Sequence, residues 1–322
     1  RRHTRLLTQS RGLGDVYKRQ GEDIAGAGSF DLGVVQRKVF PDEERYRRIE
    51  TTCARRDVVL VGGTVDDIDT LEIYDLACGL VHLGAHTLTL VLPWFGYQTM
   101  ERASKRGEIV AAKNRARLFS SIPTAGSGNR AVLIDLHSEG IPHYFSGNIR
   151  PVHVQARSVV LQAIRDFGGE DFVLGATDAG RAKWVERLAN DLLVDAAFVF
   201  KRRLSDTQTE VTALAADVEG RPVVIYDDMI RTGGSLISAA QSYKAAGASE
   251  VYAVCTHGVF AGDSLDQIRD SGVLEGIACT DTRPHVRELA DGDFLRVYSC
   301  LLYTSPSPRD TNLHLVCRLL LE

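Results

Sequence analysis

Apolar runs of strand length alternate with amphipathic segments of helical period from residue 57 onward. Strands are predicted over residues 57–62, 86–92, 131–136, 171–176, 196–200, 211–218, 223–226 and 250–255. Helices are predicted over residues 67–83, 110–120, 156–167, 181–193 and 234–246. Strands that alternate with helices in this way are typical of helical layers around a mostly parallel sheet. The pattern therefore predicts an α/β fold.

The elements fall into two successive series of similar size, and the second series starts near residue 152. A chain of 322 residues is long enough for two domains. We expect an N-terminal domain over residues 21–155 and a C-terminal domain over residues 156–299. No low-complexity stretch separates them, so the two domains are expected to pack tightly.

The two ends of the chain share a DNA signature. Residues 10–20 can be encoded by a DNA stretch whose reverse complement, read one base later, encodes residues 300–310. Two tails that are the same DNA on opposite strands indicate a translated sequencing-library adapter, and segments of that kind are set aside in fold reasoning. We therefore expect residues 1–20 and 300–322 to be adapter-derived and the native ends to differ. The alternative at the start of the chain is an Arg-rich targeting peptide.

The composition is that of an ordinary water-soluble protein, with 44% hydrophobic and 25% charged residues. A formal net charge of -4 gives no reason to expect nucleic acid or an anionic membrane as a partner. No apolar run approaches the ~20 residues needed to cross a bilayer. The six cysteines show neither paired nor metal-type spacing, so we expect reduced thiols and a cytoplasmic protein.

The most informative stretch covers residues 222–236, Pro-Val-Val-Ile-Tyr-Asp-Asp-Met-Ile-Arg-Thr-Gly-Gly-Ser-Leu. A short apolar strand is followed by Asp227 and Asp228, then by a glycine turn and a helix. Ligands of open parallel sheets collect outside the carboxyl ends of the strands. Both acids are therefore expected to face a ligand.

The glycine turn in this stretch has the features of an anion site. Gly233 and Gly234 permit positive φ and close backbone approach to an anion, and Thr232 and Ser235 add hydroxyl groups. Unpaired N–H groups at the start of the following helix face the same anion. A phosphate site beside acids that can hold hydroxyls or a Mg2+-bound group indicates a sugar phosphate. The competing interpretation is an ordinary strand-to-helix connection with a polar mouth.

Asp-Asp-Met-Ile-Arg-Thr-Gly-Gly-Ser resembles the ribose 5-phosphate loop of the phosphoribosyltransferase fold, and residues 40–297 are similar to the ribose-phosphate pyrophosphokinase family. The resemblance implies two tandem phosphoribosyltransferase-like domains with mostly parallel sheets. It also implies a set of ribose 5-phosphate-binding residues: Asp227, Asp228, Arg231, Thr232, Gly233, Gly234 and Ser235. The family usually has an acidic residue at the position of Arg231 and Thr at that of Ser235.

A second family motif is similar to residues 40–44, Phe-Pro-Asp-Glu-Glu. In the family, Phe-x-Asp-Gly-Glu contacts ATP from a neighbouring subunit, which implies ATP binding by Phe40, Asp42 and Glu44 and a homo-oligomer. A Phe beside carboxylates can stack on a purine and hydrogen-bond to it. The alternative is an acidic solvated turn with Phe40 in the core. Glu43 stands where the family has Gly.

Basic side chains at positions 102, 105, 106 and 113 can surround a polyphosphate or form a solvated face. The resemblance implies an ATP contact for Arg102. Residues 99–102 read Thr-Met-Glu-Arg, whereas the common, allosterically controlled branch of the family has Arg-Gln-Asp-Arg. The chain is therefore more similar to the plant-type class II branch, which implies simple kinetics.

His137 and Asp178 each follow a predicted strand, where an imidazole or a carboxylate can meet a metal or a phosphate oxygen. Taken alone, a residue of either kind is more often structural. The Asp-Leu-His that ends at His137 matches a family motif that contacts Mg-ATP. The Asp-Ala-Gly that begins at Asp178 matches a motif whose acid lies near the metal. The resemblance thus implies Mg2+ as cofactor, with both residues near it and His137 also at ATP.

Three cations, Lys201, Arg202 and Arg203, follow the predicted strand 196–200. From the residues alone they can form an exposed hairpin. The resemblance places Lys201 and Arg203 on the family's mobile catalytic loop. Cations suit that role because attack by a sugar hydroxyl on the β-phosphorus of ATP needs in-line positioning and charge stabilisation.

The resemblance implies a ribose-phosphate diphosphokinase that makes AMP and 5-phospho-α-D-ribose 1-diphosphate (PRPP) from ATP and ribose 5-phosphate, for nucleotide biosynthesis. One alternative is a phosphoribosyltransferase that consumes PRPP, which would leave the tandem halves and the cation loop unexplained. Another is a non-catalytic, synthetase-associated regulatory subunit, which the changes at Glu43, Thr99 and Arg231 permit.

Overall fold

The computed structural model describes residues 5–9, 20–22, 30–203, 209–214 and 217–300. They form two compact units, each treated separately below. The first comprises the described residues before Ala156 together with Thr282–Pro284. The second comprises the described residues of Ala156–Asp281 and His285–Cys300.

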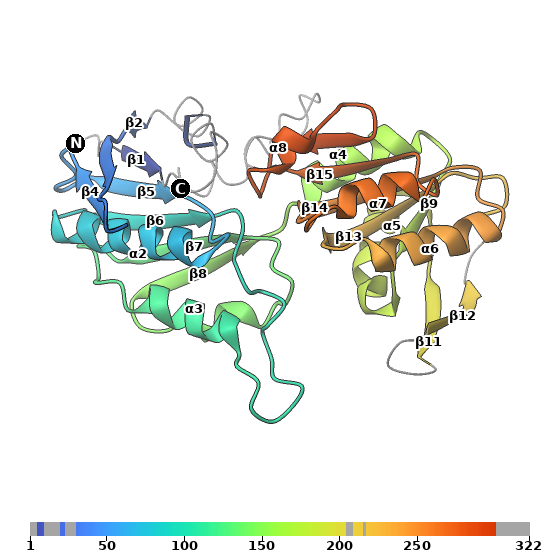
Figure 1. Cartoon of the computed structure of the whole chain (residues 1–322), viewed down its shortest axis with the longest axis horizontal. Coiled ribbons are helices and arrows are strands. Elements are labelled where there is room, and N and C mark those ends of the chain that lie inside the picture. Colours follow the sequence, from blue (N-terminus) through green and yellow to red (C-terminus); the bar gives the residue numbers. More distant parts are fainter. Residues whose placement is uncertain (1–4, 10–19, 23–29, 204–208, 215–216, 301–322) are drawn as a thin grey trace. The chain divides into compact units, whose positions relative to one another are not determined.

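The first unit is built on a sheet of six described strands with the order β2-β1-β5-β6-β7-β8 (Figure 1). All neighbouring strands in it are parallel. The strands are β1 Arg5–Gln9, β2 Asp31–Leu32, β5 Asp57–Val61, β6 Thr87–Leu92, β7 Asn129–Ile134 and β8 Ile149–Val154. Helices α2 Asp67–His82 and α3 Ala111–Ser120 and the 3-10 turn η1 Ile141–Tyr144 connect them. Leu60, Leu90 and Leu133 are fully buried in this sheet, as the apolar runs predicted.

The residues that we expected to be adapter-derived contribute a strand to this sheet. Arg5–Gln9 pairs in parallel with β5, from Arg5 opposite Asp57 to Gln9 opposite Val61. The structure therefore differs from the expectation that the first 20 residues stay outside the fold. Strand pairing uses backbone N–H and C=O groups, which almost every residue type supplies. The adapter origin of these residues stays a prediction.

An antiparallel hairpin that the hydrophobic pattern did not predict packs against α2. Its strands are β3 Val35–Val39 and β4 Arg45–Ile49. Arg37 Nε lies 2.9 Å from Glu72 Oε1, and Arg47 Nη1 lies 2.9 Å from Asp75 Oδ2. Ion pairs to helix α2 therefore replace much of the apolar contact that usually marks a half-buried strand.

The turn of this hairpin places Glu43 in the left-handed region, with a φ of 69°. The Phe40 N–H donates to the Glu44 carbonyl at 2.8 Å and the Glu43 N–H to the Phe40 carbonyl at 2.9 Å, which holds the turn. Glycine adopts positive φ without the steric cost of a Cβ atom. We expect Glu43→Gly to raise the free energy of unfolding by about 1 kcal/mol, measured by urea denaturation. Glu44→Gly, at a position without positive φ, is the control, and an equal gain there would contradict the role of backbone strain.

The second unit has its own parallel sheet, with the order β10-β9-β13-β14-β15-β16 over the described strands (Figure 1). The strands are β9 Val173–Ala176, β10 Asp195–Ala197, β13 Val223–Ile230, β14 Val251–Gly258, β15 Gly276–Thr280 and β16 Leu295–Tyr298. The helical elements are α4 Arg157–Gly168, η2 Ala179–Arg181, α5 Ala182–Leu192, α6 Gly234–Ala245, α7 Ser264–Asp270 and α8 Val286–Leu289. Val223, Ile225 and Val251 are fully buried in its core.

Predicted strands of the second unit have different limits in the structure, and two of them show why. The predicted strand 196–200 is divided between β10 and β11 Val199–Arg203, which pairs antiparallel with β12 Thr209–Leu214 outside the main sheet. The predicted strand 223–226 continues to Ile230 because the pairing of β13 with β14 extends to Ile230 opposite Gly258.

In the part of the chain that the structure describes, no helix is both long and apolar enough to cross a membrane.

Candidate functional site

The carboxyl ends of β9 and β13 bring the predicted acid pair next to a hydroxyl group. Tyr226 lies opposite Ala176 in the β13–β9 pairing, so the residues that follow are neighbours. Thr177 Oγ1 donates to Asp227 Oδ2 at 2.9 Å, and the Asp228 N–H donates to Asp227 Oδ1 at 2.8 Å. The two acids lie within β13 rather than after it, yet they occupy the end of the sheet where ligands of parallel sheets bind.

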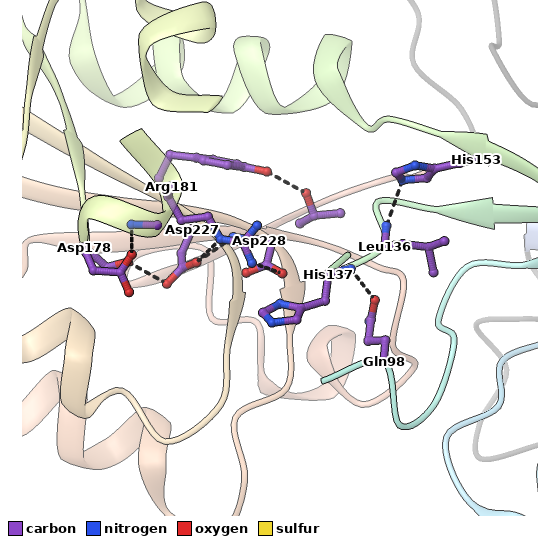
Figure 2. Close-up of polar contacts among 12 residues, drawn as sticks. Gln98, Leu136, His137, His153, Asp178, Arg181, Asp227 and Asp228 are labelled. Carbon is purple, nitrogen blue, oxygen red and sulfur yellow. Dashed lines mark hydrogen bonds and ion pairs between the residues drawn. The ribbon is translucent and has the colours of Figure 1, made fainter. Parts of the chain in front are cut away.

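Arg181 contacts both acids of the pair (Figure 2). Its Nη2 lies 2.6 Å from Asp228 Oδ2, and its Nε lies 3.6 Å from Asp227 Oδ1. Asp228 is only 5% exposed. Burial, and then the charge of Asp228, raises the pKa of Asp227 to about 7, whereas Arg181 and the Thr177 hydroxyl act in the opposite direction. Our sequence analysis missed Arg181, whose only local signal was a cation at a strand-to-helix turn.

The glycine turn joins β13 to α6 with the geometry that an anion loop requires. Gly233 has a φ of 77°, and a Cβ atom on it would lie 2.4 Å from Ile268 Cγ1, so both conformation and packing demand glycine. Gly234 begins α6 and has open space where a Cβ atom would lie. Thr232 and Ser235 are exposed on either side. The start of α6 therefore presents backbone N–H groups beside two accessible hydroxyl residues.

Arg231, which departs from the family pattern, holds the loop through its backbone. Its carbonyl accepts hydrogen bonds from the Ala261 N–H at 2.9 Å and the Ser264 hydroxyl at 3.0 Å. Its side chain is exposed. Because these bonds use only the backbone carbonyl of Arg231, an arginine is compatible with this loop in place of an acid.

Asp178 lies beside the acid pair at the end of β9 (Figure 2). Its Oδ1 accepts the Gly180 N–H at 2.8 Å, and the residue is exposed. Within residues 5–9, 20–22, 30–203, 209–214 and 217–300, no group of three or more His, Cys, Asp or Glu side chains is arranged to hold a metal ion. Mg2+ is often bound by one or two carboxylates together with substrate phosphates. An exposed carboxylate beside the acid pair fits that requirement.

His137 follows β7 in the first unit, and neighbouring side chains accept hydrogen bonds from its N–H and from that of Leu136 (Figure 2). The His137 N–H donates to Gln98 Oε1 at 2.8 Å, and the Leu136 N–H donates to His153 Nε2 at 2.9 Å. Burial lowers the pKa of His153, which favours the neutral ring that can accept this bond. Gln98 is 1% exposed, and its Nε2 has no hydrogen-bond partner among the described residues. The sequence analysis missed Gln98 and His153 because neither belongs to a recognised motif.

Residues 40–44 form the turn between β3 and β4. Phe40 is 36% exposed, so the alternative that places it in the core is wrong. Its ring meets the Tyr46 ring at a centroid distance of 6.2 Å, and Lys38 Nζ lies 4.8 Å from its centroid. Asp42 and Glu44 are exposed in the same turn. An aromatic face and two carboxylates are thus accessible together, as the family motif implies.

The remaining predicted site residues are three cations, Arg102, Lys201 and Arg203. The Arg102 side chain is 82% exposed, with Nε 3.5 Å from Glu101 Oε1. Lys201 and Arg203 lie on β11, where their backbones pair with Val211 and Thr209. The side chains of these two cations lie outside what the structure describes. Their catalytic role stays a prediction.

The chain has two tandem units with parallel sheets, and the second unit carries an acid pair, a glycine turn and a helix start in succession. These features define a protein of the phosphoribosyltransferase fold class. The solved phosphoribosylpyrophosphate synthetase from Mycobacterium smegmatis shares the fold, with a TM-score of 0.79 over 92% of this chain and 94% of that chain at 23% sequence identity. The predicted fold class is confirmed.

Sequence comparisons narrow the class to a family. Residues 14–122 match the N-terminal domain of ribose phosphate pyrophosphokinase, and residues 190–297 match the phosphoribosyl synthetase-associated domain. The chain is 32% identical over 263 residues to a ribose-phosphate pyrophosphokinase from Fusobacterium nucleatum, covering 80% of this chain and 81% of the relative. It is 32% identical over 289 residues to the chloroplastic ribose-phosphate pyrophosphokinase 1 of Arabidopsis thaliana, covering 88% of this chain and 69% of the relative. The chain belongs to the ribose-phosphate pyrophosphokinase family, a family of diphosphotransferases, and this prediction is confirmed.

Proposed function

We propose that this protein is a Mg2+-dependent ribose-phosphate diphosphokinase. It transfers the diphosphoryl group of ATP to the anomeric hydroxyl of D-ribose 5-phosphate, giving AMP and PRPP. The observation that carries the proposal is the acid pair beside the glycine turn, Asp227 and Asp228 next to Gly233, in a chain of the ribose-phosphate pyrophosphokinase family.

The sugar substrate is held by residues of β13 and of the loop that follows. The carboxylates of Asp227 and Asp228 accept hydrogen bonds from ribose hydroxyls. The 5-phosphate lies at the start of α6, where backbone N–H groups and the hydroxyls of Thr232 and Ser235 surround it. Binding the sugar at both its hydroxyls and its phosphate fixes the anomeric hydroxyl for in-line attack.

The nucleotide is held by residues of the first unit. The exposed ring of Phe40 stacks on the adenine, while Asp42 and Glu44 hydrogen-bond the nucleoside. These three residues act on the ATP of a neighbouring subunit in a homo-oligomer, as the family motif implies. Arg102 and His137 contact the phosphates, since a cation and an imidazole N–H can both donate to phosphate oxygens.

Transfer joins the anomeric oxygen to the β-phosphorus and breaks the bond between that phosphorus and the α-phosphate oxygen, which leaves with AMP. Lys201 and Arg203 stabilise the charge of the transferred group. When bound, Mg2+ neutralises and orients the phosphate oxygens. Asp178 would hold it, because Mg2+ prefers oxygen donors. His137 is the second residue for which the family motif implies a place at the metal.

A second candidate function is that of a non-catalytic subunit that associates with an active synthetase. The match of residues 190–297 to a synthetase-associated domain is the observation that favours this second function. The retained Lys201, Arg203, His137 and Asp178 favour the enzyme. A soluble, cytoplasmic enzyme that supplies PRPP to nucleotide biosynthesis, with no nucleic-acid or membrane partner, is the setting we propose.

The proposed reaction predicts that purified protein with ATP, ribose 5-phosphate and Mg2+ produces AMP and PRPP in equal amounts. Lys201→Ala is expected to lower the rate by about a hundredfold, the effect of removing one charge-stabilising group. Nucleotide and PRPP are quantified by chromatography. Folded protein that forms no AMP contradicts the proposal, and AMP formation that appears only with an added active synthetase points to the associated subunit.

A further inference from the structure

Arg181 places a positive charge between the two carboxylates of the acid pair Asp227 and Asp228. Its guanidinium bridges Asp228 at 2.6 Å and Asp227 at 3.6 Å, and 22% of its side chain is exposed (Figure 2). The last residue of the turn η2 thereby reaches from the end of β9 to the end of β13. All the groups involved belong to the second unit.

Two adjacent carboxylates in a half-buried place need a nearby positive charge to stay ionised together. Like charges disfavour each other's ionisation, and burial disfavours both. The Asp228 side chain is 7% exposed and that of Asp227 is 20% exposed, so water screens the pair poorly. In sites that bind sugar phosphates, a divalent cation often supplies the missing positive charge. Here Arg181 already supplies it from within the chain.

The guanidinium also leaves acceptor positions for a sugar on Asp227. A carboxylate offers about four acceptor positions on its two oxygens. Asp227 accepts hydrogen bonds from the Thr177 hydroxyl and the Asp228 N–H, and the closer contact of Arg181 is to a single oxygen of Asp228. An arginine paired with a carboxylate stays charged at every accessible pH. The pair is therefore bridged by a permanent positive charge and held in one geometry by residues of the chain itself.

We propose that Arg181 is a positioning residue that takes the place of a divalent cation at the ribose site, so that ribose 5-phosphate binds to Asp227 and Asp228 without Mg2+. Mg2+ is then needed only at the nucleotide. The inference rests on the proposed function, because it takes the acid pair as the site of ribose hydroxyls. It adds that the ribose 5-phosphate site can bind its ligand before Mg2+ is bound.

Calorimetric titration of ribose 5-phosphate into the whole protein, with EDTA or with Mg2+ and without nucleotide, tests the inference. The unmodified protein is expected to bind with dissociation constants that agree within about threefold in the two buffers. Arg181→Gln is expected to bind at least about tenfold more weakly in EDTA and to recover in Mg2+, since a charge-assisted contact is lost and a divalent cation can replace it. Arg181→Lys, which keeps the charge but not the planar fork, is expected to fall between the two.

Lys183→Gln is the matched control, because it removes one positive charge from an exposed position in α5 close to Arg181. It is expected to bind like the unmodified protein in both buffers. Thermal melting of each variant establishes that it is folded, and if Arg181→Gln does not fold, Arg181→Lys carries the comparison. Equal binding by the folded Arg181 variants and the unmodified protein in EDTA overturns the inference.

The titration also separates this inference from the proposed function. If the unmodified protein binds ribose 5-phosphate only with Mg2+, the role of Arg181 is overturned while the diphosphokinase activity stands. If the folded, unmodified protein binds ribose 5-phosphate in neither buffer, the proposed function fails and the inference fails with it. Binding in EDTA by a protein that forms no AMP supports the sugar site and contradicts only the reaction.

Discussion

Gly233→Ala is expected to lower the free energy of unfolding by about 3 kcal/mol, and the adjacent Gly234→Ala is not. Gly233 has a φ of 77°, a conformation that costs an alanine roughly 1–2 kcal/mol. Its new Cβ atom would lie 2.4 Å from Ile268 Cγ1 and 2.6 Å from Ile268 Cδ1, and Ile268 is fully buried. Overpacking of this kind adds about 1–3 kcal/mol. Urea denaturation monitored by circular dichroism measures the loss.

Gly234→Ala makes the same chemical change one residue later, where no atom of the described residues beyond its chain neighbours and its own helix backbone lies within 4 Å of the new Cβ. Alanine is the better helix former, so this variant is expected to gain up to about 1 kcal/mol. A double-mutant cycle with Ile268→Ala separates the two costs at Gly233, because removing the isoleucine side chain relieves only the clash. Equal destabilisation by Gly233→Ala and Gly234→Ala contradicts the special role of Gly233.

The anion loop should respond to the same substitution. If Gly233→Ala folds, the altered turn shifts the backbone N–H groups at the start of α6, and ribose 5-phosphate binding is expected to weaken by about tenfold or more. Calorimetric titration measures this change. Unaltered affinity in a folded Gly233→Ala protein contradicts the phosphate assignment to this loop.

Asp69→Asn is expected to stabilise the protein by about 3 kcal/mol at pH 8 and by less than about 1 kcal/mol at pH 4. Asp69 lies in the first turn of α2 and is 4% exposed. Burial, followed by the charges of Asp66 and Glu72, raises its pKa from 3.8 to about 7. Its Oδ2 has no hydrogen-bond partner within the described part of the chain. The folded protein therefore holds a carboxyl group that resists ionisation.

The direction of the pH effect follows from this raised pKa. Below pH 3.8 the group is protonated in both states and contributes nothing to pH dependence. Between about pH 4 and pH 7 the unfolded chain releases the proton and the folded chain retains it, so stability falls as pH rises. Above about pH 7 both states are ionised and the loss is complete. Asparagine removes this loss because it does not titrate.

Urea titrations of the Asp69→Asn variant and the unmodified protein at pH 4, 6 and 8 measure the difference. Asp270→Asn makes the same change at an exposed acid at the end of α7 and serves as the control. It is expected to alter stability by less than about 0.5 kcal/mol at each pH. A gain from Asp69→Asn that does not grow between pH 4 and pH 8 contradicts the raised pKa.

Local pattern was sufficient for most of the helices. Residues 67–83 were predicted as a helix and α2 covers Asp67–His82, because its buried positions recur at helical spacing. The hairpin β3–β4 was not predicted, since its strands read Val-Gln-Arg-Lys-Val and Arg-Tyr-Arg-Arg-Ile. Their packing on α2 uses ion pairs such as Arg37 with Glu72, and a partner 35 residues away leaves no local signal.

Parts of the candidate site also differ in how well the sequence predicted them. The glycine turn was predicted at the right residues, because positive φ and close approach are properties of glycine itself. The end of β13 was misplaced, since backbone bonds to β14 extend the strand beyond its apolar run. The roles of Lys201 and Arg203 remain predictions, because their side chains lie outside the described part of the chain.

By itself the sequence determined the α/β class, the family and the loop that begins with Asp227 and Asp228. Each of these depends on residue type and on spacing along the chain, which a sequence contains in full. Only the tertiary structure decided that Arg181 contacts both members of the acid pair and that Gln98 holds the backbone of His137. These contacts join separate elements, and their geometry exists only once the parallel strands have aligned the ends that carry them.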